Sequence, residues 1–240
     1  HSFPTRRSSD LRPKTGMRQA ESDLDVIIPA GPGEQSWRSL LACLPEHWSI
    51  LISAVDERPA DVPDRVGWQT GPAGRGRQLN LAAGTTTARW LWIVHADSQP
   101  SLEAIGAIEA TAASSQDCLG YLDLQFLADG PRLVALNALG ANLRSRWLKQ
   151  PYGDQGFLLP RCWFEKLGGF RTDLNRGEDL DFVIRARAAG LRLKRLDGRI
   201  LTSARRYRDH GWLATTWQHQ INAWALIRLA KSSIESAKDQ

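Results

Sequence analysis

Short apolar runs alternate with amphipathic stretches along most of the chain. Apolar runs bounded by turn residues predict buried strands, and apolar residues recurring every three or four positions predict helices. The predicted strands are residues 24–28, 50–55, 90–95, 121–127, 156–159, 191–196 and 200–203. The predicted helices are a segment carrying Trp37, Leu40, Leu41 and Leu44, followed by residues 76–88, 103–113, 131–147, 161–167 and 177–189. Early alternation of strand and helix favours parallel strands joined by right-handed crossovers.

The later half of the chain is more mixed, so we expect one three-layer α/β domain with a mixed central sheet over residues 17–210. Residues 1–16 are polar and patternless and end just before Met17, the only methionine. We expect these sixteen residues to be a non-native leader; a natural disordered arm is the alternative. Residues 211–240 predict a C-terminal amphipathic helix, whose apolar face carries Leu213, Trp217, Ile221 and Trp224.

Composition and charge narrow the class of protein. Apolar residues make up 42% of the chain and charged residues 24%, as in an ordinary globular protein. The net charge is +5, and residues 161–210 hold thirteen Lys and Arg against seven Asp and Glu. This basic half favours phosphate-bearing partners or an anionic membrane surface. We expect no nucleic-acid partner.

The sequence pattern also bears on localisation. No apolar run approaches the ~20 residues of a transmembrane helix, and no apolar core of a secretory signal is present. The odd number and wide spacing of Cys43, Cys118 and Cys162 suggest neither a metal site nor a redox pair. We expect a cytoplasmic protein. The apolar face of residues 211–236 has three interpretations: packing on the domain, a dimer contact, or peripheral contact with the inner face of a membrane.

The segment around residues 90–98 is the most informative part of the sequence. An apolar run ends at His95-Ala96-Asp97, and a carboxylate at the end of a strand lies where open α/β sheets bind ligands. Hard divalent cations prefer carboxylate oxygens and leave coordination positions for substrate phosphate. Asp97 is therefore a candidate metal ligand. His95 is either a second ligand, which Mn²⁺ tolerates, or a hydrogen-bonding residue.

Three further segments suit a nucleoside diphosphate. Asp56 follows a predicted strand, where an acidic side chain can accept hydrogen bonds from a base or a ribose. The glycine- and arginine-rich segment 74–80 opens a helix, and helix starts favour anions. It contains Arg75, Arg77 and Asn80 and lacks the Gly-Lys-Ser/Thr of a P-loop. Adjacent arginines at 205–206 could brace a diphosphate leaving group. The alternative is a surface turn for Asp56, a flexible loop for segment 74–80 and a plain basic surface for residues 205–206.

Two polar segments suit an acceptor. The loop 152–156 contains Asp154 and Gln155, which could hydrogen-bond sugar hydroxyls, although simple turn chemistry also explains it. Glu178 and Asp179 open a predicted helix, with Asn175 as its N-cap and Glu178 completing a capping box. Asp181 and Arg185 are spaced to pair on the helix surface. The helix start would keep Asp179 ionised and able to accept a proton from an alcohol.

Taken together, these segments resemble a family-2 glycosyltransferase with the GT-A fold, over roughly residues 23–210. The matching motifs, in the family's order, are Val26-Ile27-Ile28-Pro29-Ala30, Asp56, segment 74–80, Val94-His95-Ala96-Asp97-Ser98, Gly153-Asp154-Gln155, Leu167-Gly168-Gly169-Phe170 and Glu178-Asp179-Leu180-Asp181. The His-Ala-Asp form, the Gly-Asp-Gln loop and Ser203-Ala204-Arg205-Arg206 are similar to the bacterial subgroup named for its association with radical-SAM and selenium-related proteins. The motif set is fairly specific for the superfamily and poorly specific for the substrate.

The resemblance implies an inverting transferase that uses a nucleotide-sugar donor, an unknown hydroxyl acceptor and Mn²⁺ or Mg²⁺. Asp97, with His95, would hold the cation, and Asp179, next to Glu178, would be the catalytic base. The implied donor-binding residues are Pro29, Ala30, Glu34, Asp56, Arg75, Arg77, Asn80, Ala96 and Arg206. The implied acceptor-binding residues are Asp154, Gln155, Gly169 and Phe170.

Two departures from the family pattern keep other functions open. The loop 29–34 lacks the Asn-Glu pair that usually follows the proline, and His95 replaces the first acidic residue of the metal motif. A nucleotidyltransferase is one alternative, although its usual Lys- or Arg-bearing glycine loop is missing after the first strand. A non-catalytic sensor of nucleotide sugars, or a partner-binding module, is the other.

Overall fold

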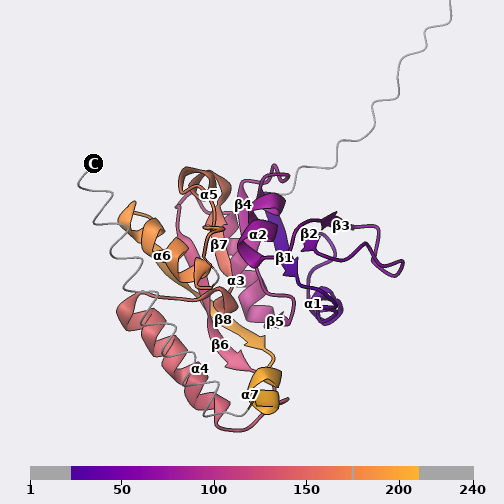
Figure 1. Ribbon diagram of the computed structural model, residues 1–240. Coiled ribbons are helices and arrows are strands. Elements are labelled where there is room, and N and C mark those ends of the chain that lie inside the picture. Colours follow the sequence, from indigo (N-terminus) through magenta and orange to yellow (C-terminus); the bar gives the residue numbers. More distant parts are fainter. Residues whose placement is uncertain (1–22, 175, 211–240) are drawn as a thin grey trace, which may run out of the picture.

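A mixed eight-stranded sheet forms the centre of the protein (Figure 1). The computed structural model describes residues 23–174 and 176–210. Its strands are β1 Leu24–Ala30, β2 Ser49–Ala54, β3 Val66–Thr70, β4 Trp90–Ile93, β5 Ser98–Pro100, β6 Leu119–Phe126, β7 Phe157–Pro160 and β8 Leu193–Thr202. Its helices are α1 Trp37–Leu41, α2 Arg75–Ala83, α3 Leu102–Ala112, α4 Val134–Leu143, α5 Arg161–Lys166, α6 Glu178–Ala188 and α7 Arg205–His210, with a π-helical turn η1 Arg144–Leu148 and a 3₁₀ turn η2 Gly153–Gln155.

The strand order β3-β2-β1-β4-β7-β6-β8-β5 places a parallel half beside a mixed half. β3, β2, β1 and β4 run parallel, as the early strand–helix alternation predicts. β7 then runs antiparallel to β4, with Phe157 opposite Ile93. β6 pairs antiparallel with β7 and parallel with β8, and β5 closes the edge antiparallel to β8. The expected mixed sheet is therefore confirmed.

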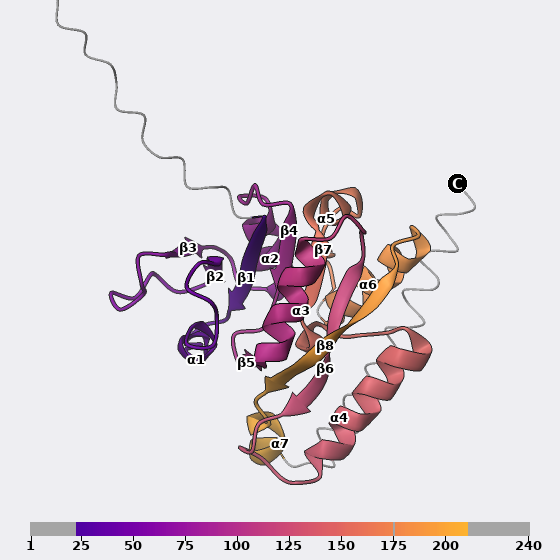
Figure 2. The same ribbon diagram turned by 180° about the vertical axis from the view of Figure 1, so that it is seen from behind.

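Two layers of helices cover the two faces of the sheet, which Figures 1 and 2 show from opposite sides. Residues of α1 and α3 join alternate residues of β1, β2 and β4 in one buried cluster, which includes four tryptophans. Residues of α2, α5 and α6 join the other set of strand residues in a second cluster, which includes four phenylalanines. Side chains of successive strand residues point to opposite faces, so these apolar strands supply both cores. The expected three-layer arrangement is confirmed.

Several predicted elements have different bounds. The two strands expected at 191–196 and 200–203 form one strand, β8, because Gly198 continues it with φ +90°. A Cβ at Gly198 would lie 2.3 Å from the Ala104 nitrogen, so the strand also needs glycine to approach α3. The helix expected at 131–147 begins only at Val134 and changes to π geometry at Arg144. The short strands β3 and β5 are additions to the predicted set.

The start of α6 corrects another prediction. Its N-cap is Gly177, in the left-handed region at φ +81°, and the N-cap provides no side-chain hydrogen bond. The capping box predicted from Asn175 and Glu178 is therefore wrong, and Asn175 itself lies outside the described residues. The predicted pair of Asp181 and Arg185 is present at 2.8 Å, but Asp181 is buried rather than on the helix surface.

The predictions for residues 1–16, for a start near Met17 and for a helix over 211–240 lie outside the described residues. Within the described part of the chain, no helix combines the length and the apolar character needed to cross a membrane. Cys43, Cys118 and Cys162 are free thiols.

Candidate functional site

The site lies at the edge of the sheet where β1, β2 and β4 end. These parallel strands finish at Ala30, Ala54 and Ile93, so the loops that follow them share one edge. β7 runs the opposite way and begins at the same edge, because Phe157 pairs with Ile93. The loop before β7 therefore meets the loops after β1, β2 and β4. In open α/β sheets, ligands bind at the carboxyl ends of the parallel strands.

Gln78 fixes the ends of the first two strands. Its buried amide nitrogen donates hydrogen bonds to the Ala30 carbonyl at 2.7 Å and to the Ser53 carbonyl at 2.9 Å. Ala30 and Pro29 are buried at this edge. Asp56 extends beyond it, and one of its carboxylate oxygens accepts a hydrogen bond from the Gly33 N–H at 2.7 Å. Asp56 thus holds the loop after β1, and its contact with a base or ribose stays a prediction.

Glu34 and Arg205 connect this loop to the chain after β8. The Arg205 guanidinium donates to the Glu34 carboxylate at 2.6 Å and to the Ser36 hydroxyl at 3.3 Å. Burial raises the pKa of Glu34, but hydrogen bonds from the Ser36 N–H and hydroxyl and from Arg205 outweigh it, so the net pKa is lowered. The ion pair closes one side of the site. Arg206 belongs to α7, and the position of its side chain is not described.

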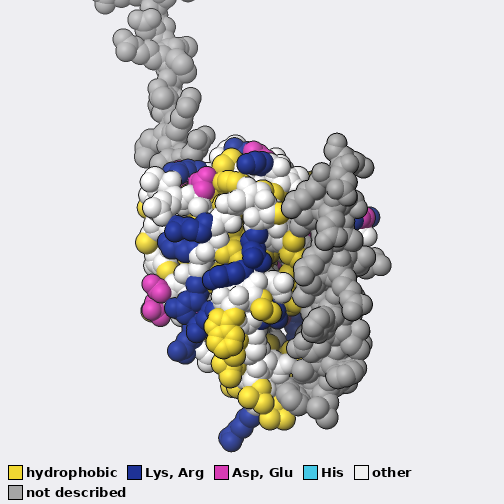
Figure 3. All heavy atoms as spheres, turned by 90° about the vertical axis from the view of Figure 1, so that its left-hand side faces the viewer, with side chains coloured by type: hydrophobic (Ala, Val, Ile, Leu, Met, Phe, Trp, Pro, Cys, Tyr) yellow, Lys and Arg dark blue, Asp and Glu magenta, His cyan; other side chains and the backbone are white. Residues whose placement is uncertain are grey.

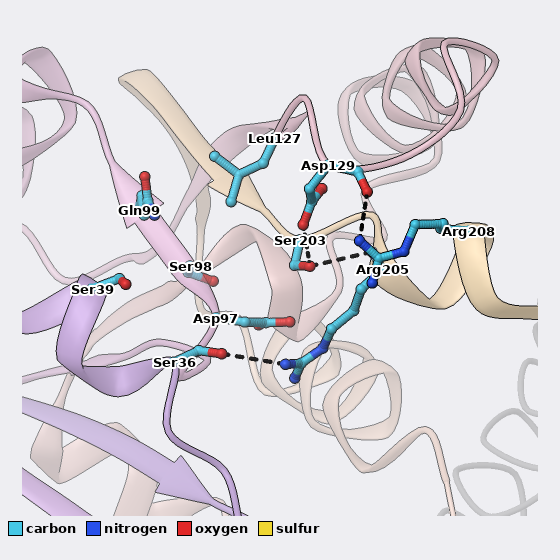
Figure 4. A pocket seen from close by; sticks show the side chains of 10 residues that line it. All are labelled: Ser36, Ser39, Asp97, Ser98, Gln99, Leu127, Asp129, Ser203, Arg205 and Arg208. Atoms are coloured by element: carbon cyan, nitrogen blue, oxygen red, sulfur yellow. Dashed lines mark hydrogen bonds between the residues drawn. The ribbon is translucent and has the colours of Figure 1, made fainter.

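A polar pocket of about 250 Å³ opens beside this ion pair (Figure 4). It is lined by Ser36, Ser39, Asp97, Ser98, Gln99, Leu127, Asp129, Ser203, Arg205 and Arg208. Figure 4 shows Asp97 beside the hydrogen bond that joins Ser36 and Arg205. Asp129 accepts hydrogen bonds from the Ser203 hydroxyl and the Ala204 N–H, which fixes the start of α7. Asp97 interacts electrostatically with Arg205, so the pocket offers a carboxylate and a guanidinium, which suits an anion held together with a cation.

Gly153 marks the point where the second half of the site meets the first. Its N–H donates to one Asp179 carboxylate oxygen at 2.7 Å, and the Leu180 N–H donates to the other at 2.8 Å. A Cβ on Gly153 would lie 3.0 Å from His95 Nε2 and 3.2 Å from the same Asp179 oxygen. His95 and Asp179 therefore both lie close to Gly153, and a Cβ at this position would be in tight contact with both side chains.

Asp154 links the carboxylates electrostatically. The pKa of Asp154 is raised from 3.8 to about 6, chiefly by burial. Repulsion from Asp179 and Asp97 also raises it, whereas attraction to Arg144 and Arg75 lowers it. One oxygen of Asp154 is buried and has no hydrogen-bond partner among the described residues. Asp154 interacts electrostatically with both Asp97 and Asp179, so these residues lie near one another although they are far apart in sequence.

Glu178 and Arg75 form a second pair at the cleft. Their charged atoms are 3.4 Å apart, and Glu178 is buried. Burial raises the pKa of Glu178, Arg75 opposes the rise, and the neighbouring Asp179 adds to it. The pair joins the start of α2 to the start of α6. Arg77, in contrast, is exposed and forms no hydrogen bond or ion pair with the rest of the described chain.

Some side chains that were predicted to bind a ligand are hydrogen-bonded within the protein instead. Gln155 is completely buried, and its amide contacts Ser145, the Leu122 carbonyl and the Tyr152 N–H. This burial argues against direct contact with an acceptor, so Gln155 supports the loop instead.

The loop after α5 is fixed in a similar way. Asn80 exchanges two hydrogen bonds with the Phe170 backbone at 2.8 Å, and the Phe170 ring is buried in the second core cluster. Gly169 has φ +68°, and a Cβ there would lie 2.5 Å from the Asn80 amide oxygen. These residues shape the cleft wall, and their predicted donor and acceptor contacts stay predictions.

The described residues contain no group of three or more His, Cys, Asp or Glu side chains arranged to hold a metal ion. Asp97 supplies a carboxylate ligand in a pocket of about 250 Å³, where the second carboxylate, Asp129, already accepts hydrogen bonds from Ser203 and Ala204; Ala96 beside Asp97 is buried. Mg²⁺ is commonly held by one or two carboxylates plus substrate phosphates and waters. The residues present therefore fit a cation that arrives with its diphosphate, and they do not fit a fully protein-ligated metal centre.

Sequence reasoning missed several residues of the site. Gln78 lies in the predicted segment 74–80, but its hydrogen bonds to the ends of β1 and β2 leave no pattern in the local sequence. Arg144 stacks over the Tyr152 ring at 3.5 Å and acts on Asp154, although the two are separated in sequence. Asp129 and Arg208 line the pocket from segments that carried no motif. Their acidic and basic character was visible, but their position was not.

Comparison with known proteins establishes the fold. No family model and no curated protein matches the chain. Residues 1–349 of S. aureus TarS, in complex with UDP-GlcNAc, match with a TM-score of 0.58 at 14% identity, over 75% of this chain and 58% of that chain. The mannosyltransferase PcManGT from Pyrobaculum calidifontis, in complex with GDP-Man and Mn²⁺, matches with a TM-score of 0.54 at 16% identity, over 76% and 57%.

The chain thus spans less than two thirds of the length of these structures. At such low identity, the likeness concerns the fold rather than the substrate. Both structures hold a nucleotide sugar, and one of them is a mannosyltransferase. The protein therefore has the GT-A fold of nucleotide-sugar glycosyltransferases.

Proposed function

We propose that this protein is an inverting glycosyltransferase of family 2, which moves a sugar from a nucleoside diphosphate to a hydroxyl acceptor. The observation that carries the proposal is that His95 and Asp179 both lie next to Gly153, and that the neighbouring Asp154 is near enough to Asp97 and Asp179 to be repelled by both. The similarity to the radical-SAM-associated subgroup rests on sequence motifs alone. The cytoplasmic location is part of this proposal and is consistent with three free thiols.

The donor half of the site would hold the nucleotide and its diphosphate. The nucleoside would lie over the ends of β1 and β2, beside Pro29, Ala30 and Asp56. The diphosphate would occupy the polar pocket between Asp97 and Arg205. Arg205 already contacts Glu34, so an incoming phosphate competes with that carboxylate for the same guanidinium. Mn²⁺ or Mg²⁺, held by Asp97 and assisted by His95, would supply charge stabilisation for the leaving nucleoside diphosphate.

The acceptor half would supply the base. Two backbone N–H groups hold the Asp179 carboxylate in one orientation toward the cleft. In the proposed step, the acceptor oxygen forms a bond to the anomeric carbon while the bond from that carbon to the phosphate oxygen breaks. The acceptor proton passes to Asp179, and the nucleoside diphosphate leaves with the bonding electron pair. Asp154 would accept a hydrogen bond from a hydroxyl group of the acceptor.

A donor screen tests the proposal. The full chain is incubated with a panel of nucleotide sugars and candidate acceptors, with Mn²⁺ or Mg²⁺, and products are identified by mass spectrometry. We expect release of nucleoside diphosphate and loss of that activity in Asp179→Asn and in Asp97→Ala. Asp97→Ala should keep the parent melting temperature, whereas Asp179→Asn should lower it slightly without unfolding the protein, because its amide nitrogen cannot accept one of the two backbone hydrogen bonds. Asp64→Asn is the matched control, because Asp64 is exposed and away from the cleft.

The same assay separates the alternatives. Release of pyrophosphate would indicate that the protein transfers a nucleotide rather than a sugar. Tight nucleotide-sugar binding without turnover of any donor would indicate a sensor. Full activity in the Asp179→Asn variant would show that the base lies elsewhere.

A further inference from the structure

The outward face of α4 and η1 is an apolar surface without a partner among the described residues. Its large side chains, between 50% and 76% exposed, are Leu133, Leu136, Leu139, Trp147 and Leu148. The opposite face of the helix, with Val134, Ala138 and Ala141, is the one that is buried. We call the exposed set the α4 outer face. Figure 3 shows hydrophobic side chains gathered on the lower part of the molecule at the level of α4.

This surface is concentrated rather than scattered. The described residues include seven large hydrophobic side chains that are exposed, and five of them belong to the α4 outer face. Isolated exposed leucines are ordinary on a protein surface, but contiguous apolar patches mark interaction sites. Leu133, Leu136 and Leu139 recur every three residues, and Trp147 and Leu148 follow eight and nine positions after Leu139, so the patch runs along α4 and η1, as on a helix that packs against another helix.

Gly140 adds a feature that points to a helical partner. It lies within the stripe, and a Cβ built on it would have no neighbour within 4 Å. Glycine inside a helix is unfavourable, and the fold here does not require it. A glycine between leucines leaves a notch in the stripe. Such a notch accepts a bulky side chain from a closely packed neighbouring helix.

The chain itself supplies a suitable neighbour. α7, the last described helix, packs on the first turn of α4, where Tyr207 and Ala204 contact Val134 in a small buried cluster. Figures 1 and 2 both show α7 beside this end of α4. The described chain therefore ends beside the start of the apolar stripe, and residues 211–240 follow directly in the sequence. Their own predicted stripe carries Leu213, Trp217, Ile221 and Trp224.

We propose that residues 211–228 form a helix that packs along the α4 outer face in the direction of α4. At about 1.5 Å per residue, a helix over this segment spans roughly 25 Å, and the stretch from Leu133 to Leu148 spans roughly 22 Å. The two stripes therefore match in length as well as in character. Packing of the tail removes both apolar faces from water, which neither achieves alone.

The position of this contact gives it a consequence for the cleft. η1 ends at Leu148, and Arg144 in η1 donates to the Gln150 carbonyl at 3.0 Å and stacks on Tyr152. A tail packed against Trp147 and Leu148 thus supports the loop that carries Asp154. The docking itself does not depend on the proposed function.

Photo-cross-linking of the full chain tests the proposal. Leu139 is replaced by p-benzoyl-phenylalanine, and an equal mixture of ¹⁴N- and ¹⁵N-labelled chains is irradiated. We expect a cross-link between position 139 and the tryptic peptide 209–228 of the same isotope, hence within one chain. Leu102→p-benzoyl-phenylalanine is the control, because Leu102 is 87% exposed on α3, and it should give no link to that peptide.

Two tail variants sharpen the test. Trp217→Asp places a charge on the predicted stripe, whereas Gln218→Asp places it outside the stripe. We expect Trp217→Asp to abolish the cross-link and to speed hydrogen exchange in residues 134–148 by at least tenfold, and Gln218→Asp to change neither. No cross-link to the tail, or mixed-isotope cross-links to a second copy, would overturn the proposal. Linkage to lipid in place of the tail, with anionic phosphatidylglycerol vesicles present, would overturn it in favour of a membrane.

Discussion

Replacement of Asp154 by asparagine should stabilise the protein above pH 6 and leave its stability unchanged near pH 4. The side chain is half-buried, one carboxylate oxygen has no partner among the described residues, and Asp97 and Asp179 repel its charge. Burial raises the pKa of Asp154 to about 6 in the folded protein, against 3.8 for the unperturbed group. Asparagine keeps the shape of the side chain and removes the charge.

The expected magnitude follows from the two pKa values. Between pH 3.8 and about pH 6 the folded protein holds a proton on Asp154 that the unfolded chain has lost. Stability therefore falls as the pH rises through this window, and the full cost is present above it. At about 1.4 kcal/mol per pKa unit, ionised Asp154 costs the folded state at most about 3 kcal/mol at pH 7.5. The neutral amide of the Asp154→Asn variant carries no such cost.

Urea unfolding, followed by tryptophan fluorescence at pH 4.0, 5.5 and 7.5, measures this effect. The difference in unfolding free energy between Asp154→Asn and the parent should grow from near zero to about 3 kcal/mol across the series. Asp64→Asn, on an exposed residue, should show no such trend. A difference that is the same at all three pH values would refute the reasoning, because the cost would then not come from ionisation.

Three other substitutions test separate contacts by the same unfolding assay. Glu34→Gln should cost about 1 kcal/mol at pH 7, because Arg205 loses a partly exposed ion pair. The pKa of Glu34 is lowered in the folded protein, so this contribution is lost as the pH falls below about 4.5. Equal costs at pH 7 and pH 3.5 would contradict this prediction. Gln155→Leu should cost at least about 2 kcal/mol, because several buried polar groups lose their partner, and a neutral effect would show that water replaces the amide. Gly198→Ala should lower the free energy of unfolding by at least about 2 kcal/mol, because alanine is strained at φ +90°. Gly106→Ala, with open space in α3, is the control and should be neutral or slightly stabilising. Similar effects at the two positions would argue against strain.

The strands that carry the donor half of the site could be predicted from the sequence, since each is an apolar run with a clear end: Pro29 for β1, Asp56 after β2, and His95-Ala96-Asp97 after β4. β1, β2 and β4 are buried on both faces, which gives a strong local signal. β3 and β5 lacked that signal, because β3 is half-exposed and β5 has only three residues. β8 was divided into two strands because Gly198 interrupts the pattern, although a close contact with Ala104 is what requires the glycine.

The candidate site was predicted as a set of residue types and only partly as a set of contacts. The sequence assigned Asp97 and Asp179 to one site, and both interact electrostatically with Asp154, but their roles in that site stay predictions. The roles of the other predicted site residues depend on which side chains are buried and hydrogen-bonded within the protein. Gln155 and Asn80 are ordinary polar loop residues in the sequence, but each is fixed by hydrogen bonds from distant segments. Local sequence does not reveal such long-range partners, because they depend on how the strands are ordered.

The place of β8 in the sheet has a consequence for how the protein is made. β8 lies between β6 and β5, so that Ser98 pairs with Thr202 across a long stretch of the chain. The polar pocket contains residues from both of these strand ends. Pairing between distant segments carries a large loop-closure cost and forms late. During synthesis on the ribosome, the parallel strands can assemble early, but the pocket is completed only after Thr202 and α7 have emerged.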